Sequence, residues 1–119
     1  MVTRKVILIA DDEDMIRNYV RILLHDEGYE VLTAANGNEA VGLSRTHPGC
    51  IDLLLTDVHM PQMDGIGAYR RICAERADMK VLFMSGAAFQ EDLPEPWPLL
   101  SKPFEPNALL AKVNEILDH

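Results

Sequence analysis

Five polar side chains in this sequence have the types and positions needed to handle a phosphoryl group. Asp11 and Asp12 follow one short apolar run, Asp57 follows another, and Ser85 and Lys102 follow two more. Carboxylates that lie together repel one another, so they either raise one another's pKa or bind a hard cation. Oxygen ligands with room left for water suit Mg²⁺. With the lysine charge and the hydroxyl, the set could neutralise three phosphoryl oxygens during transfer.

Each of these residues alone also has a plain structural explanation. An acidic stretch such as Asp11–Asp14 at a helix start offers N-caps and complements the helix dipole. Ser85 alone would be a turn residue, and Lys102 alone a solvated surface charge. Their joint placement at successive strand ends favours a site, because ligands of open α/β sheets bind outside the carboxyl ends of the strands.

The strands that must position these residues are predicted from five short apolar runs. Continuous apolar runs are typical of strands that are covered on both faces, as in parallel sheets. The runs are Val6–Ala10, Val31–Ala35, Asp52–Thr56, Val81–Met84 and Pro98–Ser101.

Segments with helical periodicity alternate with these strands. The predicted helices start near Asp14, after Asn36–Asn38, after the turn at Asp64 and Gly65, and at Pro106. With right-handed crossovers, this alternation predicts an α/β fold: a doubly wound, five-stranded parallel sheet with helices on both faces. The 119 residues are enough for one domain, which we place at residues 1–119.

The overall composition argues against several classes of function. A net charge of −8 would repel a phosphate backbone, so we expect no direct binding to nucleic acid. The apolar run before Asp11 is too short to be a signal peptide or a membrane span, so we expect a cytoplasmic protein without membrane contact. Cys50 and Cys73 lack metal-ligand spacing, and we predict that both are small apolar fillers in a reducing compartment.

In their order and spacing, four motifs of the chain resemble the receiver domains of bacterial two-component signalling. The resemblance covers residues 5–118 and implies a flavodoxin-like fold. The motifs are ADDED at Ala10–Asp14, LLLTDVHMPQMDG at Leu53–Gly65, MSGA at Met84–Ala87 and SKPF at Ser101–Phe104.

The resemblance implies that Asp57 is the phosphoacceptor and that Mg²⁺ (or Mn²⁺) is the cofactor. The side chains of Asp12 and Asp57 and the backbone carbonyl of His59 would bind the metal. Asp11 would act mainly through a bound water.

Two further residues acquire roles from the same resemblance. Ser85 would bond a phosphoryl oxygen after transfer, and Lys102 would pair with the phosphoryl group. The bond from Lys102 to Pro103 would be cis.

The resemblance also implies a function in a phosphorelay. A histidine kinase or a histidine phosphotransfer protein would donate the phosphoryl group, and the change at Ser85 would bias the chain between two arrangements that a downstream protein partner reads. The chain would assist only its own phosphorylation and dephosphorylation, so we expect a switch and not an enzyme.

The chain departs from the family between Gly86 and Ser101. This connection is short and contains DLPEPWP, whose prolines exclude a regular helix. The fourth helix of the family is therefore predicted to be absent or reduced to one turn near Phe89–Asp92. The position that is often aromatic in the family, three before the lysine, is Leu99, and we expect the nearby Trp97 to pack beneath the loop.

Two other classes of protein have the same layered architecture. A small phosphatase or phosphotransferase resembling dehalogenases would use an acid at the end of the first strand and a second acid two residues on, for which Asp11, Asp12 and Glu13 would have to serve. It would leave TDVHMPQMDG unexplained. A flavin carrier of flavodoxin type would need a phosphate-binding loop where Asp11–Asp14 lie.

Overall fold

Five parallel strands form one sheet in the order β2-β1-β3-β4-β5. The computed structural model describes residues 4–86 and 93–118. This strand order is the flavodoxin-like one, so the predicted fold is confirmed. The strand bounds lie within one or two residues of the apolar runs: β1 Val6–Ala10, β2 Glu30–Ala34, β3 Leu53–Asp57, β4 Lys80–Gly86 and β5 Leu99–Lys102.

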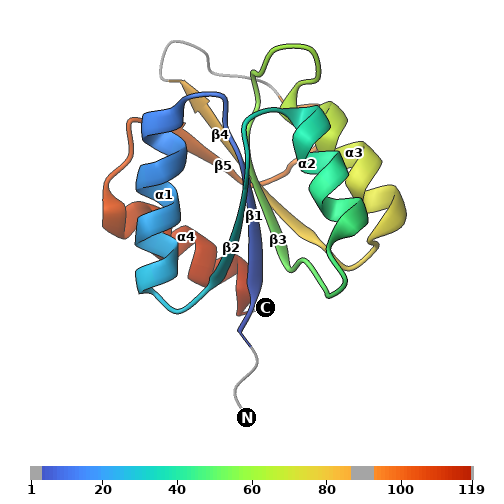
Figure 1. The fold of residues 1–119 in the computed structure, drawn as a ribbon. Helices are drawn as coiled ribbons and strands as arrows, with labels where there is room; N and C mark the ends of the chain where they lie inside the picture. Colours follow the sequence, from blue (N-terminus) through green and yellow to red (C-terminus); the bar gives the residue numbers. More distant parts are fainter. Residues whose placement is uncertain (1–3, 87–92, 119) are drawn as a thin grey trace.

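Four helices cover the two faces of the sheet in pairs (Figure 1). On one face lie α1 (Asp14–Asp26) and α4 (Pro106–Leu117), and on the other lie α2 (Gly37–Thr46) and α3 (Gly65–Glu75). Each strand therefore has packing partners on both sides, which is why the runs are continuously apolar and not alternating.

The helices begin where the sequence supplies starting signals. The side chain of Asn36 accepts a hydrogen bond from the N–H of Glu39, and that of Asp64 accepts one from the N–H of Gly67. Pro106 is the first residue of α4, a position whose N–H has no partner within the helix, so the missing N–H of proline costs no hydrogen bond. These local signals fix where α2, α3 and α4 start, whereas the N-cap residue of α1, Glu13, makes no side-chain capping bond.

Two apolar cores result from the alternation of side chains along the strands. Ile7 and Ile9 of β1 pack with residues of α1 and α4, whereas Leu8 and Ala10 pack with residues of α2 and α3. β1 and β3 are buried at every position. The polar residues at the ends of these strands are therefore positioned by closely packed backbone.

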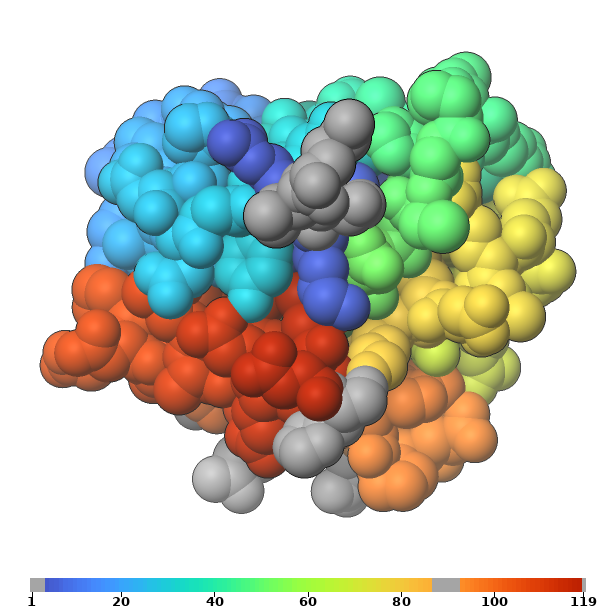
Figure 2. Space-filling view, turned by 90° about the horizontal axis from the view of Figure 1, so that it is seen from below, coloured from blue at the N-terminus to red at the C-terminus, as the bar shows by residue number. Residues whose placement is uncertain are grey.

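Residues 93–98, the described part of the connection from β4 to β5, form no helix. Trp97 packs there with its ring centroid 5.4 Å from both Tyr69 and Phe83, and Arg70 lies 5.9 Å from the centre of the ring. Seen from below, this orange segment lies against the yellow-green of α3 (Figure 2). The prediction that Trp97 packs beneath the loop is confirmed, and the turn predicted at Phe89–Asp92 lies outside the described residues.

One expectation about the cysteines is wrong. Both thiols are free, but only Cys73 is partly buried, whereas Cys50 is exposed. Cys50 lies in the connection that leads into β3, outside the packed layers, so it fills no core position. Among the described residues, no helix is both long and apolar enough to span a bilayer.

Candidate functional site

The predicted site residues gather where four strands end. Asp57 is the last residue of β3 and Lys102 the last of β5, while Asp11 follows β1 directly and Ser85 is the last but one residue of β4. The parallel register places Gly86 beside Lys102 on neighbouring strands. The sheet thus brings residues that are far apart in sequence to one edge, as the sequence predicted.

Lys102 lies at the centre of this group. Its ammonium nitrogen is 2.8 Å from Asp57 Oδ2 and 2.9 Å from Asp11 Oδ2, and the carboxylate of Glu13 is 3.7 Å away. Asp11, Asp57 and Lys102 are all buried. Lys102 therefore offsets two carboxylates that would otherwise be buried without a counter-charge, which is a costly arrangement. The structural alternative of a solvated surface lysine is excluded.

Burial and charge act in opposite directions on the ionisable groups of the site. Burial raises the pKa of the Asp11 carboxyl, although the hydrogen bond from Lys102 and the N–H of Glu13 lower it. Burial lowers the pKa of Lys102, but its hydrogen bonds to Asp57 and Asp11 outweigh this effect and leave the pKa above its ordinary value. The lysine is therefore charged at neutral pH.

Three carboxylates of the site form a set of oxygen donors suited to a divalent metal. One oxygen from each of Asp11, Asp12 and Asp57 lies within 4.8 Å of the others, and the Asp12 side chain is exposed. Hard oxygen donors with an open, solvated side suit a cation that keeps part of its water shell. The donor set therefore fits the divalent metal that the resemblance implies.

His59 and Ser85 complete the edge of the site. The backbone N–H of His59 donates to Asp57 Oδ1 at 3.2 Å, while its side chain is exposed. The metal-binding role of its carbonyl stays a prediction. Ser85 is 1% exposed and lies on β4, next to the strand that carries Asp57. The Lys102–Pro103 peptide bond is cis, as the resemblance implied.

Sequence reasoning missed two features that hold the site together. A Cβ atom on Gly65 would lie 2.1 Å from the carbonyl oxygen of Asp57, so only glycine fits there. Arg17 donates a hydrogen bond to the carbonyl oxygen of Asp11 and another to the Asp14 carboxylate. Its spacing of three residues from Asp14 on a predicted helix was the available signal, but the contact with Asp11 was visible only in three dimensions.

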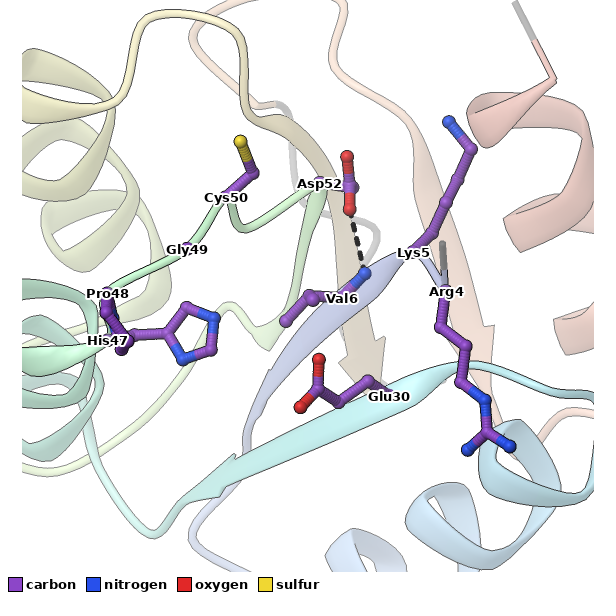
Figure 3. A pocket seen from close by; sticks show the side chains of 9 residues that line it. All are labelled: Arg4, Lys5, Val6, Glu30, His47, Pro48, Gly49, Cys50 and Asp52. Atoms are coloured by element: carbon purple, nitrogen blue, oxygen red, sulfur yellow. Dashed lines mark hydrogen bonds between the residues drawn. The ribbon is translucent and has the colours of Figure 1, made fainter. Parts of the chain in front are cut away.

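A cavity of about 570 Å³ lies at the opposite end of the sheet, where β1 and β2 begin (Figure 3). It is lined by charges of both signs, including Lys5 and Glu30. Asp52 belongs to this end, where its carboxylate accepts a hydrogen bond from the N–H of Val6. None of the predicted site residues lines this cavity, so it is separate from the carboxylate cluster.

Comparisons with known proteins agree with this geometry. Residues 7–114 match the family model of the response regulator receiver domain. The chain is 35% identical to the response regulator receiver protein CpdR of Brucella abortus, over 95% of this chain and 97% of that protein. It is also 35% identical to the sensor kinase CckA of the same organism, over 94% of this chain but 12% of the kinase.

The fold comparison gives the same result. The chemotaxis protein CheY4 of Vibrio cholerae superimposes with a TM-score of 0.83 at 29% identity, over 97% of this chain and all of that one. Several transcriptional regulators that match are longer proteins, and this chain spans 45 to 49% of their length. Similarity over nearly the whole chain, to a protein of equal length and to parts of longer ones, shows that this chain belongs to the response regulator receiver domain family.

Proposed function

We propose that Asp57 accepts a phosphoryl group from a phosphohistidine of a partner protein. The observation that carries this proposal is the buried carboxylate of Asp57 at the end of the central strand, 2.8 Å from the ammonium of Lys102 and beside the carboxylates of Asp11 and Asp12. The proposed acceptor, its counter-charge and the proposed metal donors would thus belong to one edge of the sheet. A helix-capping role for the carboxylates, or a surface role for the lysine, would not explain why these side chains lie together.

In this proposal, the side chains of Asp12 and Asp57 and the carbonyl of His59 hold Mg²⁺ (or Mn²⁺), and Asp11 acts through a bound water. When bound, the ion would supply Lewis-acid neutralisation of the phosphoryl oxygens. The acidic cluster supports this assignment, since its three oxygens lie within 4.8 Å of one another.

The residues of the chain would then act in sequence. An oxygen of Asp57 attacks phosphorus in line, and the bond from phosphorus to the donor imidazole nitrogen breaks with its electron pair on that nitrogen. The imidazole leaves as a neutral ring whose other nitrogen already carries the proton. Lys102, which contacts Asp57 Oδ2 at 2.8 Å, pairs with a phosphoryl oxygen. The hydroxyl of Ser85 donates a hydrogen bond to another oxygen, and this new bond biases the chain toward its signalling arrangement.

The partners that we propose are a histidine kinase or a histidine phosphotransfer protein as donor, and a downstream protein that reads the phosphorylated state. The chain acts as a switch and not as an enzyme, because the phosphoryl group ends on its own side chain. Two free thiols, one of them exposed, support a reducing, cytoplasmic location.

The test is incubation with acetyl phosphate and Mg²⁺, followed by intact mass. Wild type should gain one phosphoryl group, and Asp57→Asn should gain none. Asp52→Asn is a matched control, because Asp52 immediately precedes the opposite end of the same strand and its substitution should leave labelling intact. Labelling of Asp57→Asn at the wild-type level would refute the assignment.

The same experiment separates the alternative of a small phosphatase. Of the acids at the end of the first strand, Asp11 is poorly placed to be the nucleophile of that reaction, because it is fully buried and both of its carboxylate oxygens accept hydrogen bonds, from Glu13 and Lys102. A phosphatase would release many equivalents of phosphate per chain from acetyl phosphate. We expect release no faster than the loss of the phosphoryl group from Asp57.

A further inference from the structure

Every polar group of Asp11 is bonded within the chain. Its N–H donates to the Ala34 carbonyl at 3.1 Å, and its carboxylate accepts from the Glu13 N–H at 2.8 Å and from Lys102 at 2.9 Å. Its carbonyl oxygen accepts from Arg17 Nη1 at 2.7 Å. Both the backbone and the side chain of Asp11 are therefore fixed by hydrogen bonds. The next residue, Asp12, has an exposed side chain.

Arg17 joins the two ends of the short segment that contains Asp12. One arm of its guanidinium holds the carbonyl of Asp11, and the other lies 2.5 Å from the carboxylate of Asp14. The side chain of Arg17 is only 20% exposed, whereas that of Asp14 is 88% exposed. A planar guanidinium with fixed donors suits such a two-ended contact, which a single ammonium cannot reproduce.

We propose that Arg17 is a positioning residue for the metal site. By holding the carbonyl of Asp11, it fixes the backbone that presents the Asp12 carboxylate to a metal shared with Asp57. This inference rests on the proposed function, because it assumes that Asp12 and Asp57 bind the cation. Residues that orient ligands without touching the ion commonly change metal affinity by about 10- to 100-fold.

A purely electrostatic role for Arg17 predicts the opposite result. A positive charge beside an acidic cluster repels a divalent cation, so its removal alone would tighten metal binding. Loss of positioning weakens binding, because Asp12 then samples orientations that do not bind the cation. The sign of the change in metal affinity therefore separates the two roles.

The experiment measures the Kd for Mg²⁺ by titration calorimetry at a temperature where each variant is folded. Arg17→Met keeps the aliphatic stem but loses the two-ended contact, and its Kd should rise about tenfold. Arg17→Lys keeps the charge and should also bind more weakly than wild type. Arg21→Met is the matched control: its guanidinium bonds the Asn18 side chain one turn further on, and the Kd should stay the same or fall slightly.

Amide exchange provides a second readout that does not need metal. In Arg17→Met, the N–H of Glu13 should exchange faster, because its acceptor on Asp11 is less well held, while the N–H of Val58, bonded to Met84, should be unchanged. A Kd for Arg17→Met equal to or below that of wild type would overturn the proposal. If Arg17→Met does not fold, Arg17→Lys decides in the same way. Failure of wild type itself to bind Mg²⁺ would instead refute the proposed function.

Discussion

At the scale of single residues, the site depends on how one ammonium group serves two buried carboxylates. Lys102 contacts Asp11, 91 residues away, and Asp57, 45 residues away. In the unphosphorylated protein, these bonds pair one positive charge with two buried carboxylates. They also make the site sensitive to the loss of any one partner, because each loss leaves a buried charge unpaired.

Lys102→Met should destabilise the metal-free protein by about 3 kcal/mol, because it leaves Asp11 and Asp57 buried without a counter-charge. The double variant Asp57→Asn/Lys102→Met should recover part of this loss. Urea unfolding of the four proteins in the cycle measures the coupling. If the two substitutions act additively, Lys102 and Asp57 are not energetically linked.

Asp11 should give the protein a specific pH dependence. Burial raises its pKa above the ordinary value of 3.8, so the folded state holds the proton more tightly than the unfolded state does. The free energy of unfolding therefore falls as pH rises from about 3.8 through the raised pKa. The free energy of unfolding of wild type, relative to that of Asp11→Asn, should therefore fall as pH rises through this window. Above the raised pKa the difference should stay constant. A difference that favours wild type increasingly as pH rises would contradict this sign.

At the scale of elements, the start of α3 is pressed against the end of β3. The N–H of Gly65 donates to the carbonyl of Val58 at 2.9 Å, and its Cα lies against the carbonyl of Asp57. The loop of residues 58–64, which follows β3, therefore brings the start of α3 back against the end of that strand. A side chain at position 65 would therefore displace the backbone of Asp57.

Gly65→Ala should lower stability by about 2 kcal/mol and slow phosphorylation, because its Cβ would meet the Asp57 carbonyl at 2.1 Å. Gly42→Ala in α2 is the control: no atom lies within 4 Å of a Cβ there, and alanine should stabilise the helix by about 0.5 to 1 kcal/mol. Thermal unfolding and the rate of labelling by acetyl phosphate test both. Equal changes in stability and labelling rate at the two positions would mean that the short distance between Gly65 and the Asp57 carbonyl does not affect either property.

In the described part of the connection between β4 and β5, residues 93–98, aromatic packing takes the place of a helix. Trp97→Ala should cost about 2 kcal/mol, less than for a fully buried ring, because Trp97 is only partly buried between Tyr69 and Phe83. Tyr19→Ala, which removes an exposed ring on α1, should change stability by less than about 0.5 kcal/mol. Urea unfolding compares the two. A smaller cost at Trp97 than at Tyr19 would show that the ring does not support this face of the sheet.

At the scale of the whole molecule, a net charge of −8 combines with a cluster of three carboxylates at one edge. The folded state gathers these carboxylates, whereas the unfolded chain separates them. Metal that binds only the folded state should therefore stabilise the protein by mass action. If the proposed site binds Mg²⁺, the apparent stability should depend on the concentration of free Mg²⁺.

Asp12→Ala should raise the melting temperature in metal-free buffer by about 4 °C, which corresponds to about 1 kcal/mol for a chain of this size. It should also remove the stabilisation by Mg²⁺. Asp78→Ala, at an exposed acidic residue outside the cluster, should keep the response to Mg²⁺. Scanning calorimetry with and without Mg²⁺ makes the comparison. Lower melting of metal-free Asp12→Ala would show that the carboxylates do not destabilise one another.

The sequence by itself determined the strands, the helix starts and the residues at the sheet edge. Apolar runs, caps such as Asn36 and Asp64, and the prolines between Gly86 and Ser101 act over a few residues, so they can be read locally. Polar residues that follow parallel strands must meet at one edge once the sheet forms. For that reason, Asp57 and Lys102 could be placed together without coordinates.

Only the tertiary structure decided which atoms within that edge bond to one another. The sharing of Lys102 between Asp11 and Asp57, the contact of Arg17 with the Asp11 carbonyl, and the fit of Gly65 on Asp57 each depend on side-chain direction and on ångström-scale spacing. These are set by how helices pack on the sheet, which sums many weak contacts from distant parts of the chain. The combined effect of these contacts cannot be predicted from any short stretch of the sequence.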